Sequence, residues 1–114
     1  MEIILVNEGV SRTTLMEMGE QTFGDMVKAV VDIEKKVMAI GGGLHVDEES
    51  FLLERGSVQE NLWGINLHAK EDFPKFVEFD SVINIRPGQD NPSRGVEDPT
   101  VRDRVIAIVK GLVK

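Results

Sequence analysis

Residues 26–40 read MVKAVVDIEKKVMAI, and the structure of this stretch decides the fold of the chain. With a period of two, four apolar residues share one face: Val27, Ala29, Val31 and Ile33. With helical spacing, five apolar residues form one stripe: Met26, Val30, Ile33, Val37 and Ile40. Because β-branched residues favour strands over helices, we predict a β-hairpin that turns at Glu34-Lys35. One continuous helix over residues 27–38 would contradict this prediction.

The segment before the hairpin is typical of a strand followed by a helix. Residues 2–6 are largely apolar and end in a turn sequence at residues 7–9. Ser11 is placed to cap a helix over residues 12–22, because its hydroxyl can accept a hydrogen bond from a free backbone N–H in the first turn. The sequence therefore predicts a strand, a capped helix and then the hairpin.

A glycine run at residues 41–43 follows the hairpin and predicts a loop. Asp47 is placed to cap a short helix over residues 48–55. A glycine loop before a helix is also typical of a phosphate site, but Asp47, Glu48 and Glu49 would repel phosphate. The lysine and hydroxyl residue that usually complete such a loop are missing as well. We therefore do not expect a phosphate loop here.

Two alternating segments, residues 62–68 and 76–86, predict a second pair of strands with a polar connector between them. If the hairpin is centred near Asp72, its register places these residues opposite each other: Gly64 and Asp80, Asn66 and Glu78, Leu67 and Val77. The apolar residues of both segments then share one face of the sheet, and this agreement supports the pairing.

The last segment predicts a well-defined helix. Asp98 is placed as the cap and Pro99 as the first helical residue, where the missing N–H costs nothing. The apolar stripe of this helix consists of Val101, Val105, Ile108, Val109 and Leu112. The prediction for residues 1–114 is a single α+β domain with a mainly antiparallel sheet, in the order β-α-β-β-α-β-β-α, with the helices packed on one face.

Composition excludes several classes of function. Cysteine is absent, so disulfides, thiolate zinc sites and cysteine nucleophiles are excluded. The net charge of −7 disfavours nucleic acid, because binding to phosphates needs a basic surface. The chain contains no apolar stretch long enough to span a membrane, and the run at residues 3–6 is too short for a signal peptide. We therefore expect a cytoplasmic protein without a membrane partner, and no cofactor.

His45, Glu78 and Asp80 are the weak candidates for catalytic residues. His45 stands two residues before Asp47, and this spacing would suit a metal ligand or a general base. The alternative is that Asp47 serves as a helix cap, which explains its carboxylate without any chemistry. With one other histidine in the chain, we predict no metal site.

One face of the predicted strand pair is polar. It consists of Gly64, Asn66, Glu78, Asp80, Asn84 and Arg86. Carboxylate, amide and guanidinium groups that converge in this way suit a small polar ligand or a general acid/base pair. The alternative is that these residues form the solvated face of an antiparallel sheet, which is polar by default.

Arg86 and Arg94 bracket a turn-rich loop that also contains Asn91 and Ser93. Two guanidinium groups can bind a carboxylate or a phosphate through paired hydrogen bonds. We predict that both arginines point toward a common space near the N-terminus of the last helix, where the helix dipole would also favour an anion. The alternative is that acidic neighbours hold both arginines and brace the loop.

Several stretches of the chain resemble a family of short prokaryotic proteins that is grouped as a domain of unknown function. They are FGDMVKAVVDIEK (residues 23–35), GGLHVDEE (42–49), ENLWGINL (60–67), FDSVINIRP (79–87) and SRGVEDP (93–99). The resemblance covers nearly the whole chain. It implies a self-standing domain without an assigned activity, so no residue role can be transferred from it.

The expected function is a non-catalytic module that binds a small anionic ligand or a protein partner. Its ligand-binding residues would be Asn66, Asn84, Arg86, Ser93 and Arg94. The first alternative is a small hydrolase or transferase with Glu78 or Asp80 as the base and His45 or Arg86 assisting. The second alternative is a structural homo-oligomer.

Overall fold

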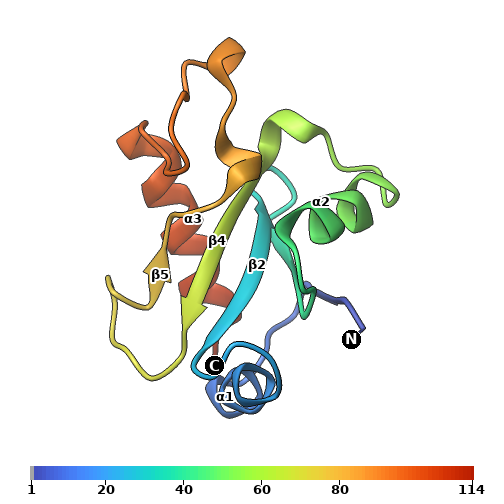
Figure 1. The fold of residues 1–114 in the computed structure, drawn as a ribbon, viewed down its shortest axis with the longest axis vertical. Coiled ribbons are helices and arrows are strands. Elements are labelled where there is room, and N and C mark those ends of the chain that lie inside the picture. Colours follow the sequence, from blue (N-terminus) through green and yellow to red (C-terminus); the bar gives the residue numbers. More distant parts are fainter. Residues whose placement is uncertain (1) are drawn as a thin grey trace.

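A five-stranded antiparallel sheet forms the centre of the computed structural model, which describes residues 2–114 (Figure 1). The strands are β1 (Ile4–Val6), β2 (Met26–Asp32), β3 (Val37–Ile40), β4 (Leu62–His68) and β5 (Val77–Glu78), in the spatial order β1-β3-β2-β4-β5. The α-helices are α1 (Arg12–Gln21), α2 (His45–Leu53) and α3 (Pro99–Leu112), and short 3-10 turns are η1 (Gln59–Asn61), η2 (Val82–Asn84) and η3 (Pro87–Gln89). The predicted α+β class and element order are confirmed.

The hairpin predicted for residues 26–40 is confirmed. β2 and β3 pair antiparallel, with Val30 opposite Ala39. Asp32 closes the turn, because its Oδ1 accepts hydrogen bonds of 2.9 Å from the backbone N–H groups of Glu34 and Lys35. The carboxylate therefore stabilises the reversal that the sequence pattern required.

The predicted caps of α1 and α3 are also confirmed. Ser11 Oγ accepts a hydrogen bond of 2.9 Å from the N–H of Thr14, and Asp98 Oδ1 accepts one of 2.8 Å from the N–H of Thr100. Each of these bonds satisfies a backbone donor that the first helical turn leaves free.

The prediction that Asp47 caps α2 is wrong. The helix begins at His45, and Leu44 occupies the N-cap without a side-chain acceptor. The reason lies in the inner face of the helix, which consists of His45, Glu48, Glu49 and Leu52. The helix begins three residues earlier than predicted, and this start places Glu48 close to the glycine loop. The Oε2 of Glu48 accepts a hydrogen bond of 3.0 Å from the N–H of Gly42.

The predicted strand over residues 76–86 is confirmed only at its beginning. β5 pairs with β4 in the predicted register, with Asn66 opposite Glu78. Beyond Glu78 the chain leaves the sheet, and the Asn84 side chain takes over the pairing with Gly64. The Gly64 N–H donates to Asn84 Oδ1 at 2.8 Å, and Asn84 Nδ2 donates to the Gly64 carbonyl at 2.9 Å. A side-chain amide thus replaces the backbone amide of a neighbouring strand.

The helices cover both faces of the sheet, whereas the sequence pattern suggested one. The larger core lies under α1 and α3 and includes Leu15, Val31, Ile65 and Val109. A smaller core lies on the other face, where Leu52 of α2 packs with residues of β2, β3 and β4. In Figure 1, α2 and α3 flank the sheet from opposite sides. Within residues 2–114, no helix has the length and apolar character needed to cross a membrane.

Candidate functional site

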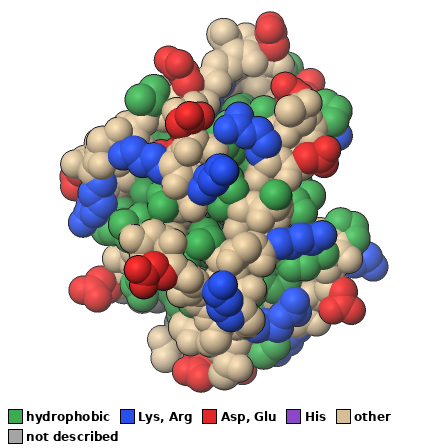
Figure 2. All heavy atoms as spheres, turned by 180° about the vertical axis from the view of Figure 1, so that it is seen from behind, with side chains coloured by type: hydrophobic (Ala, Val, Ile, Leu, Met, Phe, Trp, Pro, Cys, Tyr) green, Lys and Arg blue, Asp and Glu red, His purple; other side chains and the backbone are tan. Residues whose placement is uncertain are grey.

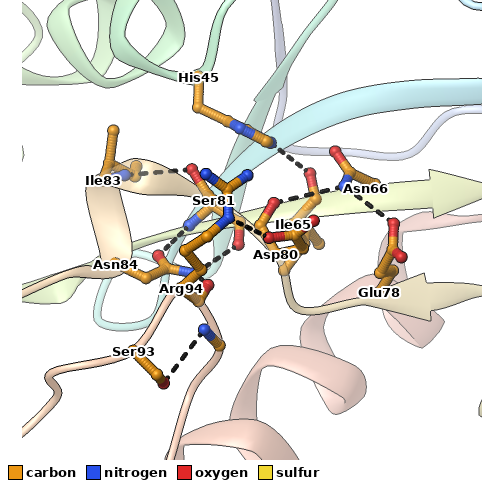
Figure 3. A network of polar contacts seen from close by, with 12 residues as sticks. His45, Ile65, Asn66, Glu78, Asp80, Ser81, Ile83, Asn84, Ser93 and Arg94 are labelled. Carbon is orange, nitrogen blue, oxygen red and sulfur yellow. Dashed lines mark hydrogen bonds and ion pairs between the residues drawn. The ribbon is translucent and has the colours of Figure 1, made fainter.

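Polar side chains gather on the α2 side of the sheet, where β4 meets the segment that follows β5 (Figure 3). We call this group the polar cluster: His45, Asn66, Glu78, Asp80 and Arg94. His45 comes from the start of α2, Asn66 from β4 and Glu78 from β5, while Asp80 and Arg94 come from the loops beyond β5. The cluster brings all three candidate catalytic residues near two of the candidate ligand-binding residues.

Asn66 lies at the centre of the polar cluster and is only 5% exposed. Its Nδ2 donates to Glu78 Oε1 at 3.0 Å and to the Asp80 carbonyl at 3.3 Å. Its Oδ1 is buried and has no hydrogen-bond partner among the described residues. Figure 3 shows this oxygen on the side away from Glu78. The cluster therefore contains one acceptor whose hydrogen-bonding capacity is unused, a costly state for a buried polar atom.

An ion pair joins Arg94 to Asp80. Arg94 Nε and Asp80 Oδ1 lie 2.6 Å apart, and the two side chains are 53% and 44% exposed. The Arg94 carbonyl is held as well, by the N–H of Ser81 at 2.9 Å and by Asn84 Nδ2 at 3.0 Å. Because Asp80 takes only the Nε, the two terminal nitrogens of the guanidinium remain without a partner in residues 2–114.

His45 is the first residue of α2, and its side chain is buried. Its Nε2 lies 2.8 Å from the Ile65 carbonyl, which can only accept, so Nε2 carries the proton and Nδ1 is the acceptor of the neutral ring. Burial lowers the pKa of His45, and the charge of nearby Lys28 lowers it further. The imidazole is therefore neutral at pH 7.

Glu78 is the most exposed acid of the polar cluster. Hydrogen bonds from Asn66 and from His68, whose Nε2 lies 3.1 Å from Glu78 Oε1, lower the pKa of Glu78. A carboxylate with a lowered pKa is a weak base. The geometry therefore makes Glu78 a charged acceptor instead of a general base.

Glu48 is a buried acid beside the cluster that the sequence did not single out. It is fully buried, and this burial raises its pKa to about 9. At pH 7 the side chain is therefore a neutral carboxylic acid. Two sequence signals could have revealed it: Glu48 follows His45 by three residues on one helix face, and it follows the glycine run at a distance that lets the side chain fold back.

Arg86 and Ser93 lie outside the polar cluster. Arg86 donates to the backbone carbonyls of Gln59 and Leu62, and its guanidinium stacks on Trp63 at 4.2 Å from the ring centre. Burial lowers the pKa of Arg86. Ser93 Oγ accepts from the N–H of Gly95 at 3.3 Å, within its own loop. These contacts brace the loop, and acidic neighbours on the loop take no part in them.

The structure brings Asn66 and Arg94 together in the polar cluster. Asn84 lies next to the cluster, and its Nδ2 donates to the Arg94 carbonyl at 3.0 Å. The two arginines have different partners, and neither of them lines the cavity at the N-terminus of α3. Across residues 2–114, no three acidic or histidine side chains are arranged to hold a metal ion.

Comparison with known proteins places the chain in a family without naming an activity. No curated protein and no solved structure matches it. A family model described as a protein of unknown function, DUF5674, matches residues 4–112. This match covers nearly the whole chain, as the resemblance of the sequence motifs implied. The chain belongs to the DUF5674 family.

Proposed function

We propose that this domain is a non-catalytic module that binds a small anionic ligand at the polar cluster. The observation that carries the proposal is the geometry of Arg94. Asp80 holds the Nε at 2.6 Å, so the guanidinium is oriented while both terminal nitrogens stay free and half-exposed. Such a fork suits a carboxylate or a phosphate, which accepts two parallel hydrogen bonds.

The charges around the polar cluster are close to balanced, because Arg94 and Lys28 offset the carboxylates of Glu78 and Asp80. Burial keeps Glu48 protonated, and it keeps His45 uncharged. Lys28 lies opposite Asn66 in the sheet, and its charge acts on His45 together with that of Arg94.

Asn66 and Asn84 would have different roles in binding. Asn66 positions the acidic side of the site, because its Nδ2 donates to Glu78 Oε1 at 3.0 Å and to the Asp80 carbonyl at 3.3 Å, while its own Oδ1 is buried. Asn84 positions Arg94, because its Nδ2 donates a hydrogen bond of 3.0 Å to the Arg94 carbonyl. The hydrogen bonds of Arg86 and Ser93 fix the loop that carries Arg94.

The geometry gives less support to the alternative functions. As general bases, Glu78 and Asp80 are poorly placed, because hydrogen bonds lower the pKa of Glu78 and Asp80 is held by Arg94. The net charge of −7 argues against nucleic acid. A homo-oligomer, a protein partner and a cytoplasmic location stay predictions from the sequence, and light scattering on the purified protein would test the first of them.

Thermal unfolding in the presence of anions tests the proposal. Phosphate, citrate and glutamate are added separately at millimolar concentration, with sodium chloride matched for ionic strength. A ligand that prefers the native state must raise the Tm. We expect a rise with at least one of the three anions, and we expect Arg94→Gln to abolish it.

Arg104→Gln is the matched control, because Arg104 is also half-exposed and pairs with a glutamate, Glu34, at 3.6 Å on another part of the surface. This variant should keep the Tm rise. Equal shifts in Arg94→Gln and the wild type, or no shift with any of the three anions, would contradict the proposal.

A further inference from the structure

A cavity of about 560 Å³ runs along α3, beside the turn that joins β2 to β3. It lies on the face of the larger core, and therefore on the other side of the sheet from the polar cluster. The volume falls within the range of small-molecule sites. The cavity is lined by apolar residues, by two small residues of α3 and by two cations, and none of its lining residues in the described chain is acidic.

Three residues of the larger core form the apolar wall of the cavity. Ile33, Ile108 and Leu112 are 6%, 9% and 7% exposed, and all three line it. The cavity therefore reaches down to the hydrophobic core. An apolar chain placed here would leave water and pack against core side chains, which favours binding.

Gly111 leaves room for the cavity, and α3 has no conformational need for a glycine there. Gly111 lies within the helix and is not among the glycines with a positive φ. A Cβ at this residue would meet nothing within 4 Å. Because glycine is less favourable than alanine in a helix, Gly111 carries a cost that no close contact explains. A larger side chain at residue 111 would occupy part of the cavity.

Both charged residues that line the cavity are cations, Lys36 and Arg104. Arg104 Nη2 donates to the Ile33 carbonyl at 3.0 Å and lies 3.6 Å from Oε2 of Glu34, whose side chain is 73% exposed. The Nε and Nη1 of Arg104 have no partner in residues 2–114, and Lys36 forms no ion pair there. Helix α3 lies behind the sheet in Figure 1, and Figure 2, the view from behind, shows lysine and arginine side chains next to hydrophobic ones.

We propose that this cavity binds a small carboxylate that carries an apolar chain. The carboxylate accepts hydrogen bonds from Arg104 and Lys36 at the mouth of the cavity. The chain packs against Ile33, Ile108 and Leu112. The site is separate from the polar cluster, whose probes phosphate, citrate and glutamate lack such a chain. Arg104→Gln therefore removes part of this site and leaves the polar cluster intact.

Hexanoate is the probe, and amide proton–nitrogen NMR spectra of the labelled protein report where it binds. We expect saturable shifts of the amides of Gly111 and Lys36 at millimolar hexanoate. Acetate lacks the chain and hexanol lacks the charge, so each should bind about tenfold more weakly or worse. Hexylammonium carries the opposite charge and should give no saturable shift.

A charge variant tests the role of the cations. Lys36→Gln combined with Arg104→Gln removes both, and we expect the Kd for hexanoate to rise about tenfold or more, which corresponds to about 1.4 kcal/mol. The control is Lys70→Gln combined with Lys75→Gln, which removes two exposed cations that do not line the cavity. This control should bind like the wild type.

A second variant fills the cavity without removing a charge. Gly111→Leu should abolish the saturable shifts, read at Lys36 and Ala107, while the Tm stays at or above that of the wild type, because leucine favours the helix. The control is Gly88→Leu, since a Cβ on Gly88 also meets nothing within 4 Å and this residue lies in η3, away from the cavity. It should bind hexanoate normally.

Four outcomes would overturn the proposal. They are no saturable shift with hexanoate, equal affinity for hexanol, tighter binding of hexylammonium, and an unchanged Kd in either the charge variant or the Gly111→Leu variant. Arg94→Gln separates this site from the polar cluster and should leave hexanoate binding unchanged. Loss of binding in Arg94→Gln would place hexanoate at the polar cluster and would also overturn the proposal.

Discussion

The backbone N–H of Gly42 donates a buried hydrogen bond of 3.0 Å to Oε2 of Glu48. This bond joins the glycine loop to the first turns of α2. A Cβ atom on Gly42 would lie 2.9 Å from Cγ of Glu48, which is shorter than an ordinary van der Waals contact. Glycine is therefore required at residue 42 by the close approach of a side chain.

We expect Gly42→Ala to lower the free energy of unfolding by about 1–3 kcal/mol, because the added methyl group overpacks a buried contact. The matched control is Gly43→Ala, whose Cβ would meet nothing within 4 Å. Urea denaturation of both variants measures the difference. Equal stabilities would show that the loop can relax around the methyl group.

The protonation of Glu48 predicts a pH dependence of stability. Its pKa is about 9 in the folded protein against a usual value of 4.5, so the folded state holds an extra proton between these values. The contribution of Glu48 is fully present below pH 4.5 and is lost as the pH rises toward 9. The slope for one such group is at most about 1.4 kcal/mol per pH unit.

Glu48→Gln tests this pH dependence, because glutamine keeps an acceptor for Gly42 and carries no proton to lose. We expect the variant to gain stability relative to the wild type as the pH rises from 5 to 9. Urea denaturation across this pH range measures the difference. A constant difference at all pH values would contradict a buried, protonated Glu48.

Asn84→Ala should destabilise the fold by about 3 kcal/mol, because it leaves buried polar groups without partners. The side chain bonds the N–H and the carbonyl of Gly64 and also the carbonyl of Arg94. Asn7→Ala, at an exposed residue, should change stability by less than about 0.5 kcal/mol. Thermal and chemical unfolding would measure both variants, and similar losses would argue against this role of Asn84.

Gly64 and Ser81 should show strong coupling in a double-mutant cycle. A Cβ on Gly64 would lie 2.5 Å from Oγ and 2.6 Å from Cβ of Ser81. We expect Gly64→Ala to cost about 1–3 kcal/mol and Ser81→Gly to recover part of this loss. Ser81→Ala should not recover it, because the clash with Cβ remains. Additive effects of Gly64→Ala and Ser81→Gly in urea denaturation would contradict the close contact.

Local features of the fold were predictable because they depend on neighbouring residues. The β-branched run of residues 26–33 favours a strand wherever it lies, and Ser11 and Asp98 cap helices within three residues of themselves. The register of Asn66 against Glu78 followed from the side-chain alternation of two strands with a short connector.

The start of α2 and the end of β5 were not predictable from the same rules. Asp47 has the preferred chemistry of a cap, but the burial of Glu48 against Gly42 moved the start of the helix. Residues 79–86 alternate like a strand, yet the side chain of Asn84 satisfies Gly64 across 20 residues of sequence. Tertiary contacts of this kind override local preference.

The sequence by itself determined the class of the fold, the order of its elements, the hairpin and two helix caps. Only the tertiary structure decided which polar groups are buried: the protonated Glu48, the neutral His45, the unused Oδ1 of Asn66 and the free N–H of Trp63. The physical reason is that helix and strand patterns are set by neighbours along the chain. Desolvation, in contrast, depends on every group that packs against a side chain, and most of these groups come from distant segments.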